Sequence, residues 1–402
     1  MKLTNKKLLL FAFLSAAIGS LFISCNKDED NAPGDIGNPT VLYIRSTDPA
    51  AADSLLVGAF MGSLVAIVGQ DLGHTVEIWF NDQKAALNPT YVTEKTIIVN
   101  VPSSVPSEVT DQIRFVFSNG EEMFYDFAVN VPAPVLYSIK SEYVEQGAIA
   151  VLKGDLFFEP TTVTFAGGKE AEIVSIDKTE IQARVPAGAD MGEITVSTNF
   201  GTAISSFLFR DNRNVVVNFD DLRHRSWNSP IAHVDAGEGR VPPCSGNYTY
   251  FEMEGVGAWQ WVNELNMMYV AEDGETGRGN IPIFPGGASV NEWGVRFEIN
   301  VPVEWREIPL EIFFAPFGGD HGRDIPVPLA RWRPWEDKGV FQTDGWVTVT
   351  VPLTEFNEDK DGNPAELSDL SQFTNLTIMY FGAADNANDI YIAIDNVRVA
   401  RI

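Results

Sequence analysis

Short runs of alternating apolar and polar residues, each closed by Gly, Pro, Asn or Asp, recur along the first half of this chain. Clear cases are Val76 to Phe80, Thr96 to Val101 and Ile113 to Phe117. A period of two predicts half-buried β-strands, and the bounding residues predict turns. No helix-period run exceeds two or three turns. The chain is therefore predicted to be all-β and built from small sandwiches.

One block of this pattern occurs twice. The spaced residues Gly69, Phe80 and Pro102 recur as Gly154, Phe165 and Pro186, with gaps of 11 and 22 residues in the first copy and 11 and 21 in the second. We align Asp71-Leu72 with Asp155-Leu156, and both copies have an Asn/Gly turn before their last strand (Asn119-Gly120; Asn199-Phe200-Gly201). Such a repeat predicts two related modules, residues 41–131 and 132–211. Their pattern resembles the IPT/TIG type of immunoglobulin fold.

The composition changes after Asn214, where Trp, Tyr and Gly become more frequent. The remaining part opens with the apolar run Val215 to Phe219 and closes with Ile390 to Val399. Strong strands at both ends predict that the first and last strands lie side by side in one sheet. Phe219-Asp220-Asp221-Leu222 and Ile394-Asp395-Asn396-Val397 resemble the ends of jelly-roll carbohydrate-binding modules, so residues 212–402 are expected to form a larger jelly-roll β-sandwich.

The N-terminus has the pattern of a processed leader. Lys2, Lys6 and Lys7 precede an apolar stretch from Leu8 to Ser24, and Cys25 follows. Residues 1–24 are predicted to be a signal peptide. A small residue before a lone Cys resembles a lipoprotein box, which implies lipidation of Cys25. Residues 25–40 are polar and lack periodicity, so we expect a flexible tether.

Charge narrows the possible partners. The formal net charge is −27 for the whole chain and becomes −30 when the three lysines of the leader are removed. This balance argues against nucleic acid, anionic lipid and polyanionic glycans as partners, whereas a neutral glycan is not repelled. The only cysteine besides Cys25 is Cys244, so no disulfide is expected once Cys25 is acylated. Cys244 is predicted to be a small buried hydrophobic residue.

Tryptophan is concentrated in the C-terminal part, where eight of the nine residues lie between Trp227 and Trp346. Trp332 and Trp335 occur in Arg331-Trp332-Arg333-Pro334-Trp335, and the proline and flanking charges predict a loop. Two exposed indoles in a loop are typical of a binding surface, and sugar rings stack on such rings. Arg331 and Arg333 are candidate donors to sugar hydroxyls. The alternative is a loop folded back onto the sandwich.

Other tryptophans give weaker signals. Trp259 and Trp261 are two residues apart, so in a strand they face the same side, which is either a sugar platform or the inner core. Trp346 and Trp79 are expected in cores, and Trp293 remains open.

Catalytic and metal signals are weak. The four histidines show no ligand spacing, and no nucleophile elbow or phosphate loop occurs. Asp220, Asp221 and Asp395 could hold a structural Ca²⁺, which prefers several oxygen ligands. Asp359 to Asn363 looks like part of a calcium loop, but without flanking helices it is better interpreted as an acidic turn. We predict no cofactor.

The order of parts resembles the surface glycan-binding lipoproteins of Gram-negative polysaccharide-utilisation loci, with a C-terminal domain of the xyloglucan-binding class. The resemblance implies a non-catalytic, monomeric protein on the outer face of the outer membrane. It implies capture of a neutral β-glucan, such as xyloglucan or mixed-linkage glucan, near an outer-membrane importer, with the immunoglobulin-like modules as spacers. Two alternatives remain open: a surface glycoside hydrolase or lyase, and a structural or adhesive surface protein.

Overall fold

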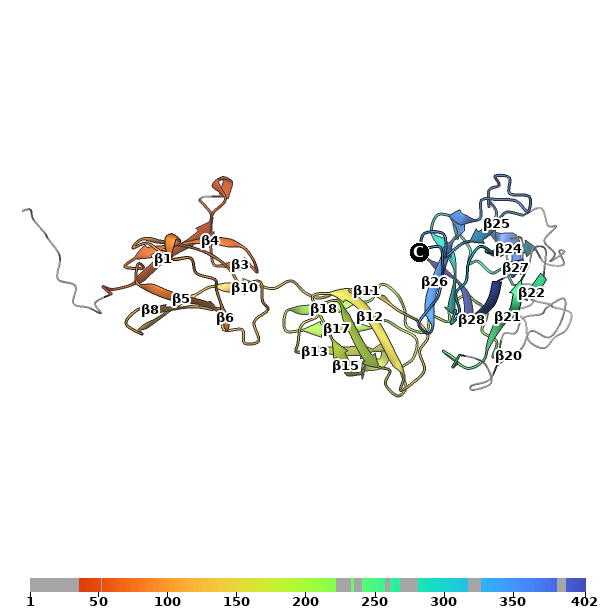
Figure 1. The fold of residues 1–402 in the computed structure, drawn as a ribbon, viewed down its shortest axis with the longest axis horizontal. Helices are drawn as coiled ribbons and strands as arrows, with labels where there is room; N and C mark the ends of the chain where they lie inside the picture. Colours follow the sequence, from red (N-terminus) through yellow and green to blue (C-terminus); the bar gives the residue numbers. More distant parts are fainter. Residues whose placement is uncertain are drawn as a thin grey trace, which may run out of the picture. The chain divides into compact units, whose positions relative to one another are not determined.

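The computed structural model describes residues 36–51, 53–221, 233–234, 241–256, 261–267, 281–316, 327–381 and 388–402. Within these ranges the regular structure is β-strand with a few short 3-10 turns, which confirms the predicted all-β class (Figure 1). No helix in the described part is long and apolar enough to cross a membrane. Compact units comprise residues 1–131 and 132–402.

The first unit holds one immunoglobulin-like module of two packed sheets. Its sheets have the strand orders β2-β1-β4-β7 and β6-β5-β8-β9, and a short parallel pair joins β10 to β3. The strands are β1 Thr40–Ser46, β2 Leu55–Leu56, β3 Gly58–Phe60, β4 Leu64–Gln70, β5 Thr75–Phe80, β6 Gln83–Lys84, β7 Thr96–Asn100, β8 Gln112–Phe117, β9 Glu122–Asp126 and β10 Ala128–Asn130. The 3-10 turns are η1 Pro49–Ala51 and η2 Pro89–Tyr91.

The second module repeats this plan with sheets ordered β11-β12-β16-β15 and β14-β13-β17-β18. Its elements are β11 Val135–Ile139, β12 Ile149–Asp155, β13 Thr161–Phe165, η3 Ala166–Gly168, β14 Lys169–Glu170, β15 Glu172–Ile176, β16 Glu180–Arg184, β17 Thr195–Thr198 and β18 Gly201–Ile204. The repeat is therefore confirmed: β1, β4 and β5 correspond to β11, β12 and β13. Phe80 and Phe165 are both buried and contact a second ring edge-on.

The repeated glycines mark a close approach of two strands. A Cβ on Gly69 would lie 2.0 Å from the carbonyl oxygen of Thr40, and one on Gly154 would lie 2.0 Å from that of Val135. Our alignment of the following residues is wrong by one position. Leu72 and Phe157, each three residues after the glycine, are the equivalent core residues.

The residue two positions after each glycine adopts the left-handed backbone conformation of the turn. Asp71 and Leu156 both have positive φ, at 54° and 61°. Asp71 therefore corresponds to Leu156, and the shared Asp-Leu letters lie in different positions of the turn.

The C-terminal domain has two larger sheets (Figure 1). One has the order β20-β21-β28-β23-β26, with β19 also paired to β28; the other has the order β22-β27-β24-β25. The elements are β19 Val215–Val217, β20 His233–Val234, β21 Tyr248–Val256, β22 Trp261–Met267, β23 Trp293–Asn300, β24 Leu310–Pro316, β25 Leu329–Trp332, β26 Val347–Pro352, η4 Leu353–Glu355, η5 Leu370–Gln372, β27 Phe373–Phe381 and β28 Asn388–Arg401. The pairing of β19 with β28 confirms that the domain's first and last strands are neighbours.

The core of this domain lies between its two sheets. Alternate residues of β24 and β27 point into it, including Leu310, Ile312 and Tyr380, and all are fully buried. Trp305 is also fully buried, and its indole N–H donates to the carbonyl oxygen of Ile308 at 2.6 Å.

Trp79 is not a core residue, contrary to the sequence expectation. Its neighbours Ile78 and Phe80 point into the core of the first module, so strand alternation directs Trp79 to the opposite face. There the Arg114 guanidinium lies 4.9 Å and the Lys84 ammonium 5.7 Å from the ring centroid. The indole is a partly exposed surface ring with two cations within cation–π distance.

Candidate functional site

Trp332 ends a strand rather than lying in a loop. It is the last residue of β25 and pairs with Leu310, which in turn pairs with Tyr380; both partners point into the core. Trp332 is therefore on the core side of an edge strand. Three aromatic rings contact it edge-on, with centroids 5.6–5.7 Å away: Phe297, Trp305 and Phe341. The indole is only partly buried, so these rings hold it in place while part of it faces solvent.

Trp335 lies three residues further on, in the turn that follows β25. It too is partly buried and packs against the same core. Its indole nitrogen is buried and has no hydrogen-bond partner in the described part of the chain. Arg333 is partly exposed, with its nearest guanidinium nitrogen 4.0 Å from the Glu358 carboxylate. From the sequence we expected both tryptophans in an exposed loop. Their partial burial against the core fits the alternative better, in which this segment folds back onto the sandwich.

The Arg331 side chain is mostly buried and is held by ion pairs and hydrogen bonds to other parts of the same domain. Its side chain is 12% exposed, and Nε donates to Glu311 at 3.1 Å. One terminal nitrogen contacts the Glu358 carboxylate, and the other donates to the carbonyl oxygens of Asp359 and Lys360 at 3.4 and 2.9 Å. These contacts occupy four of the five N–H groups of the guanidinium, so Arg331 is less available as a donor to sugar hydroxyls than the sequence suggested.

Arg331 thereby fixes the acidic turn that follows Glu358. Within that turn, Asp359 Oδ1 accepts the backbone N–H groups of Asp361 and Asn363 at 2.9 and 2.8 Å. The Asn363 side chain and these backbone donors lower the pKa of Asp359. The interpretation as an acidic turn is confirmed.

A calcium site gains no support in the described residues. They contain no group of three or more His, Cys, Asp or Glu side chains that could hold a metal. Asp220 Oδ1 accepts from the backbone and side chain of Asn247, and Asp395 is fully buried and accepts from the Cys244 thiol and the Asn396 backbone.

The other predicted tryptophans fall in different places. Trp259 lies outside the described residues, and Trp261 opens β22, where its backbone pairs with Phe381. Trp346 is partly buried, as is Trp293, which packs on the main core. The indole N–H of Trp346 donates to the carbonyl oxygen of Pro242 at 2.7 Å, and its ring meets Tyr248 edge-on.

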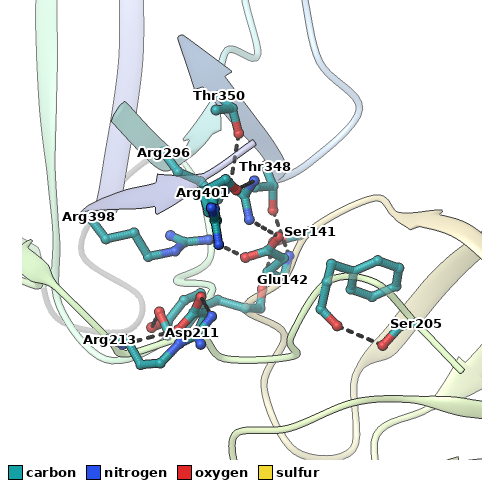
Figure 2. A network of polar contacts seen from close by, with 12 residues as sticks. Ser141, Glu142, Ser205, Asp211, Arg213, Arg296, Thr348, Thr350, Arg398 and Arg401 are labelled. Atoms are coloured by element: carbon teal, nitrogen blue, oxygen red, sulfur yellow. Dashed lines mark hydrogen bonds and ion pairs between the residues drawn. The ribbon is translucent and has the colours of Figure 1, made fainter. Parts of the chain in front are cut away.

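Sequence reasoning missed a buried polar network between the second module and the C-terminal domain (Figure 2). Arg398 of β28 is fully buried, and its Nη2 lies 2.6 Å from the Glu142 carboxylate of the second module and 2.9 Å from that of Glu298. Arg296 Nη1 contacts the other Glu142 oxygen at 3.0 Å. The Tyr143 ring lies 5.1 Å from the Arg398 guanidinium.

Uncharged groups complete the junction. Ser141 and Thr348 donate their hydroxyls to Glu298 at 2.8 and 2.6 Å, and the Glu142 backbone N–H donates to Thr348 at 2.7 Å. Burial raises the pKa of Glu142, while the guanidinium groups of Arg398 and Arg296 act in the opposite direction. The available sequence signal was a charged residue inside each of two apolar strands, Glu298 in β23 and Arg398 in β28.

Two adjoining hollows lie beside this junction. An open groove of about 600 Å³ is lined in the C-terminal domain by residues that include Asn300, Pro302 and Gln342. A narrower cleft of about 240 Å³ lies between the second module and the C-terminal domain, with Ile149 on one side and Trp346 on the other. Pro242, Asp344 and Gly345 line both hollows.

Comparisons with known proteins agree with this architecture. Residues 209–401 match the family described as surface glycan-binding protein B xyloglucan binding domain. The crystal structure of surface glycan-binding protein PbSGBP-B from Prevotella bryantii is similar at 27% identity, covering 91% of this chain and 99% of that one, with a TM-score of 0.67. An SGBP-B from a complex xyloglucan utilization locus in Bacteroides uniformis shares the fold at 17% identity, with 91% and 100% coverage and a TM-score of 0.50.

A curated relative matches a shorter stretch. An IPT/TIG domain-containing protein of Bacteroides ovatus is 33% identical over 147 residues, which is 35% of this chain and 29% of that relative. The aligned part is thus less than a third of the relative's length.

The chain is a multi-domain β-protein in which immunoglobulin-like modules precede a large C-terminal β-sandwich. Residues 209–401 belong to the xyloglucan-binding domain family of surface glycan-binding protein B, and the chain is similar to a solved surface glycan-binding protein B over 91% of its length. Members of this family are non-catalytic proteins that bind glycans at the cell surface. The enzyme alternative is thereby set aside.

Proposed function

We propose that this protein captures a neutral β-glucan, xyloglucan or mixed-linkage glucan, at the cell surface through its C-terminal domain. The observation that carries the proposal is the match of residues 209–401 to a xyloglucan-binding domain family. The charge of the chain supports it, because a strongly acidic protein repels polyanionic glycans but not neutral ones.

The contact surface that we propose is the end of β25, with Trp332, Trp335 and Arg333. Both indoles are partly exposed, and core packing holds them in fixed orientations. A ring that is already ordered loses little conformational freedom when a sugar stacks on it. Trp259 and Trp261 remain the second candidate pair. Arg331 is assigned to support of this surface through the Glu358 turn rather than to sugar contact.

We further propose that Cys25 is lipidated and anchors the chain in the outer membrane beside an importer, with residues 25–40 as the tether. Residues 1–35 lie outside the described residues. The functional units are residues 41–131, 132–211 and 212–402, and the last is a jelly roll that acts in a monomer. Because buried ion pairs join residues 132–211 to the C-terminal domain, only the first module is assigned a spacer role.

Isothermal titration of residues 26–402 against xyloglucan, mixed-linkage glucan, laminarin, mannan and starch tests the function. Trp335→Ala and Trp332→Phe are the site variants; the Phe replacement retains a ring in the aromatic cluster. Each lost stack is worth about 0.5–1.5 kcal/mol beyond its buried area, so we expect roughly a tenfold weaker affinity for Trp335→Ala.

Trp79→Ala is the matched control, since it removes a partly exposed tryptophan outside the proposed site. Binding of one β-glucan that weakens with Trp335→Ala but not with Trp79→Ala supports both the function and the site. Binding that survives in both site variants moves the site to Trp259 and Trp261. Failure of the unaltered protein to bind any of the five glycans would contradict the proposed ligand class.

A further inference from the structure

The cleft between the second module and the C-terminal domain combines an apolar wall with a polar edge. Its apolar wall includes the Trp346 ring and the aliphatic side chains of Ile149 and Val151. Its polar edge includes Lys140, Glu145 and Asp344. Sugar rings present the same combination, with an apolar C–H face and hydroxyl groups around the rim.

The walls of the cleft are held in place by the protein itself. Lys140 contributes its carbonyl oxygen to a hydrogen bond from the Thr348 backbone at 2.9 Å, and its ammonium contacts the Asp344 carbonyl. Trp346 is fixed by its bond to Pro242. The volume of about 240 Å³ corresponds to roughly eight waters, which is space for one sugar ring. A cleft whose walls are fixed before binding avoids the ordering cost that weakens many sites.

The cleft is also connected to the Trp332 surface. The Phe341 ring packs on Trp332, and the next residue, Gln342, lines the open groove. That groove shares Asp344 and Gly345 with the cleft. Phe341 and Gln342 are thus neighbours in the chain that link Trp332 to the groove, and the groove adjoins the cleft that Trp346 lines; we refer to this series of features as the path.

We propose that this path is an extended glycan-binding site in which the junction cleft is a second sugar subsite, formed jointly by the second module and the C-terminal domain. The inference rests on the proposed function and deepens it. A glycan chain that occupies the Trp332 end continues along the groove, and one of its sugar units stacks on Trp346. Oligosaccharides too short to reach the junction contact only the Trp332 end.

The test compares a long and a short ligand. Ala148→Trp in residues 26–402 adds a large side chain at the exposed rim of the cleft without removing any core group. Ala50→Trp, at an exposed position of the first module, is the matched control. Titrations use the polysaccharide that binds the unaltered protein and its shortest binding oligosaccharide, and thermal unfolding verifies that both variants fold.

We expect Ala148→Trp to weaken binding of the polysaccharide by roughly threefold to tenfold, the contribution of one stacked ring, and to leave the short oligosaccharide unchanged. Trp346→Phe should likewise weaken binding of the polysaccharide and leave binding of the short oligosaccharide unchanged. Equal polysaccharide affinity for Ala148→Trp and the unaltered protein would overturn the junction subsite while leaving the proposed function intact. Equal weakening of both ligands would also overturn it, because the effect would not depend on chain length.

Discussion

At the scale of single residues, the most unusual pair is Asp395 with Cys244. Both are buried, and the Cys244 thiol donates to Asp395 Oδ2 at 3.2 Å while the Asn396 backbone N–H donates to Oδ1 at 2.7 Å. Burial raises the pKa of Asp395 well above its ordinary value, and burial likewise raises the pKa of the Cys244 thiol. The thiol is therefore a packed, unreactive group, as its sequence context suggested.

The raised pKa of Asp395 predicts a specific pH dependence. A folded-state pKa above the unfolded one means that the fold holds this proton more tightly. The associated stability is fully present below about pH 4 and is lost as pH rises through the folded-state pKa. Asp395→Asn removes the ionisation and keeps the shape. We expect the variant to be more stable than the unaltered protein at pH 7, by roughly 2–4 °C in Tm for each kcal/mol, and to lose that advantage near pH 4.

Thermal unfolding between pH 4 and pH 8 measures this difference. The exposed Asp361→Asn variant measures the general effect of removing one negative charge from an acidic chain. A difference between Asp395→Asn and the unaltered protein that stays constant over the whole range would show that Asp395 does not titrate as its burial requires.

Arg331 illustrates a limit of sequence interpretation at this scale. The charged letters around Trp332 predicted a loop, yet Arg331 pairs with Glu311 across two strands and with Glu358, 27 residues further along the chain. Nothing local in the sequence shows that two distant carboxylates neutralise a charge. The expectation for Trp79 is wrong for a different reason: a strand position alone does not say which face a residue occupies, and alternation with the core residues Ile78 and Phe80 directs Trp79 outward.

At the scale of elements, the repeated glycines explain why the two modules share a plan. Gly69 and Gly154 each sit where the strand after the first one passes closest to it, opposite an irregular register in β1 and β11. The spacing of Gly, Phe and Pro was enough to predict the repeat. It was not enough to align the turn, because positive φ at Asp71 and Leu156 is invisible in side-chain identity.

Gly154→Ala is expected to destabilise the second module. The added Cβ would lie 2.0 Å from the Val135 carbonyl oxygen and 2.2 Å from the Phe157 ring, so either the strands or the ring must move. Overpacking of this kind costs about 1–3 kcal/mol. Gly69→Ala should act in the same direction in the first module. Calorimetry of both variants, with Gly286→Ala as the control, measures the effect, since a Cβ on Gly286 meets no atom within 4 Å. Equal unfolding temperatures for Gly154→Ala and Gly286→Ala would contradict the close approach of β12 to β11 at Gly154.

At the scale of the whole molecule, residues 132–402 are connected by charge as well as by sequence. Glu142, Glu298 and Arg398 are each almost fully buried, and they come from two different domains. A buried ion pair gives little net stability compared with apolar packing, but removing one partner leaves an uncompensated charge. Both domains could be predicted from the sequence, but this junction could not. Glu142 and Arg398 are 256 residues apart in the chain, and their pairing depends on how the two folded domains pack against each other.

Glu142→Gln is expected to weaken the junction between these two domains. Arg398 would retain Glu298 as its one carboxylate partner, together with the carbonyl oxygen of Asn396. Arg296 would lose its carboxylate partner and keep its bond to Thr350. Loss of one partner from a buried pair costs about 3 kcal/mol. Calorimetry of residues 26–402 should show the second module and the C-terminal domain unfolding together in the unaltered protein. In Glu142→Gln their transition should fall in temperature and broaden or divide.

Glu145→Gln provides the control, because Glu145 lies three residues away in the same loop and is exposed. Its transition should match that of the unaltered protein within about 0.5 kcal/mol, the usual range for surface substitutions. If Glu142→Gln also stays within that range, the network does not couple the domains, and the second module returns to the role of a spacer. If the transition divides, the cleft at Trp346 loses its fixed wall, so affinity for long glycans should fall together with domain coupling. That joint loss would connect the stability of the junction to the proposed length of the binding site.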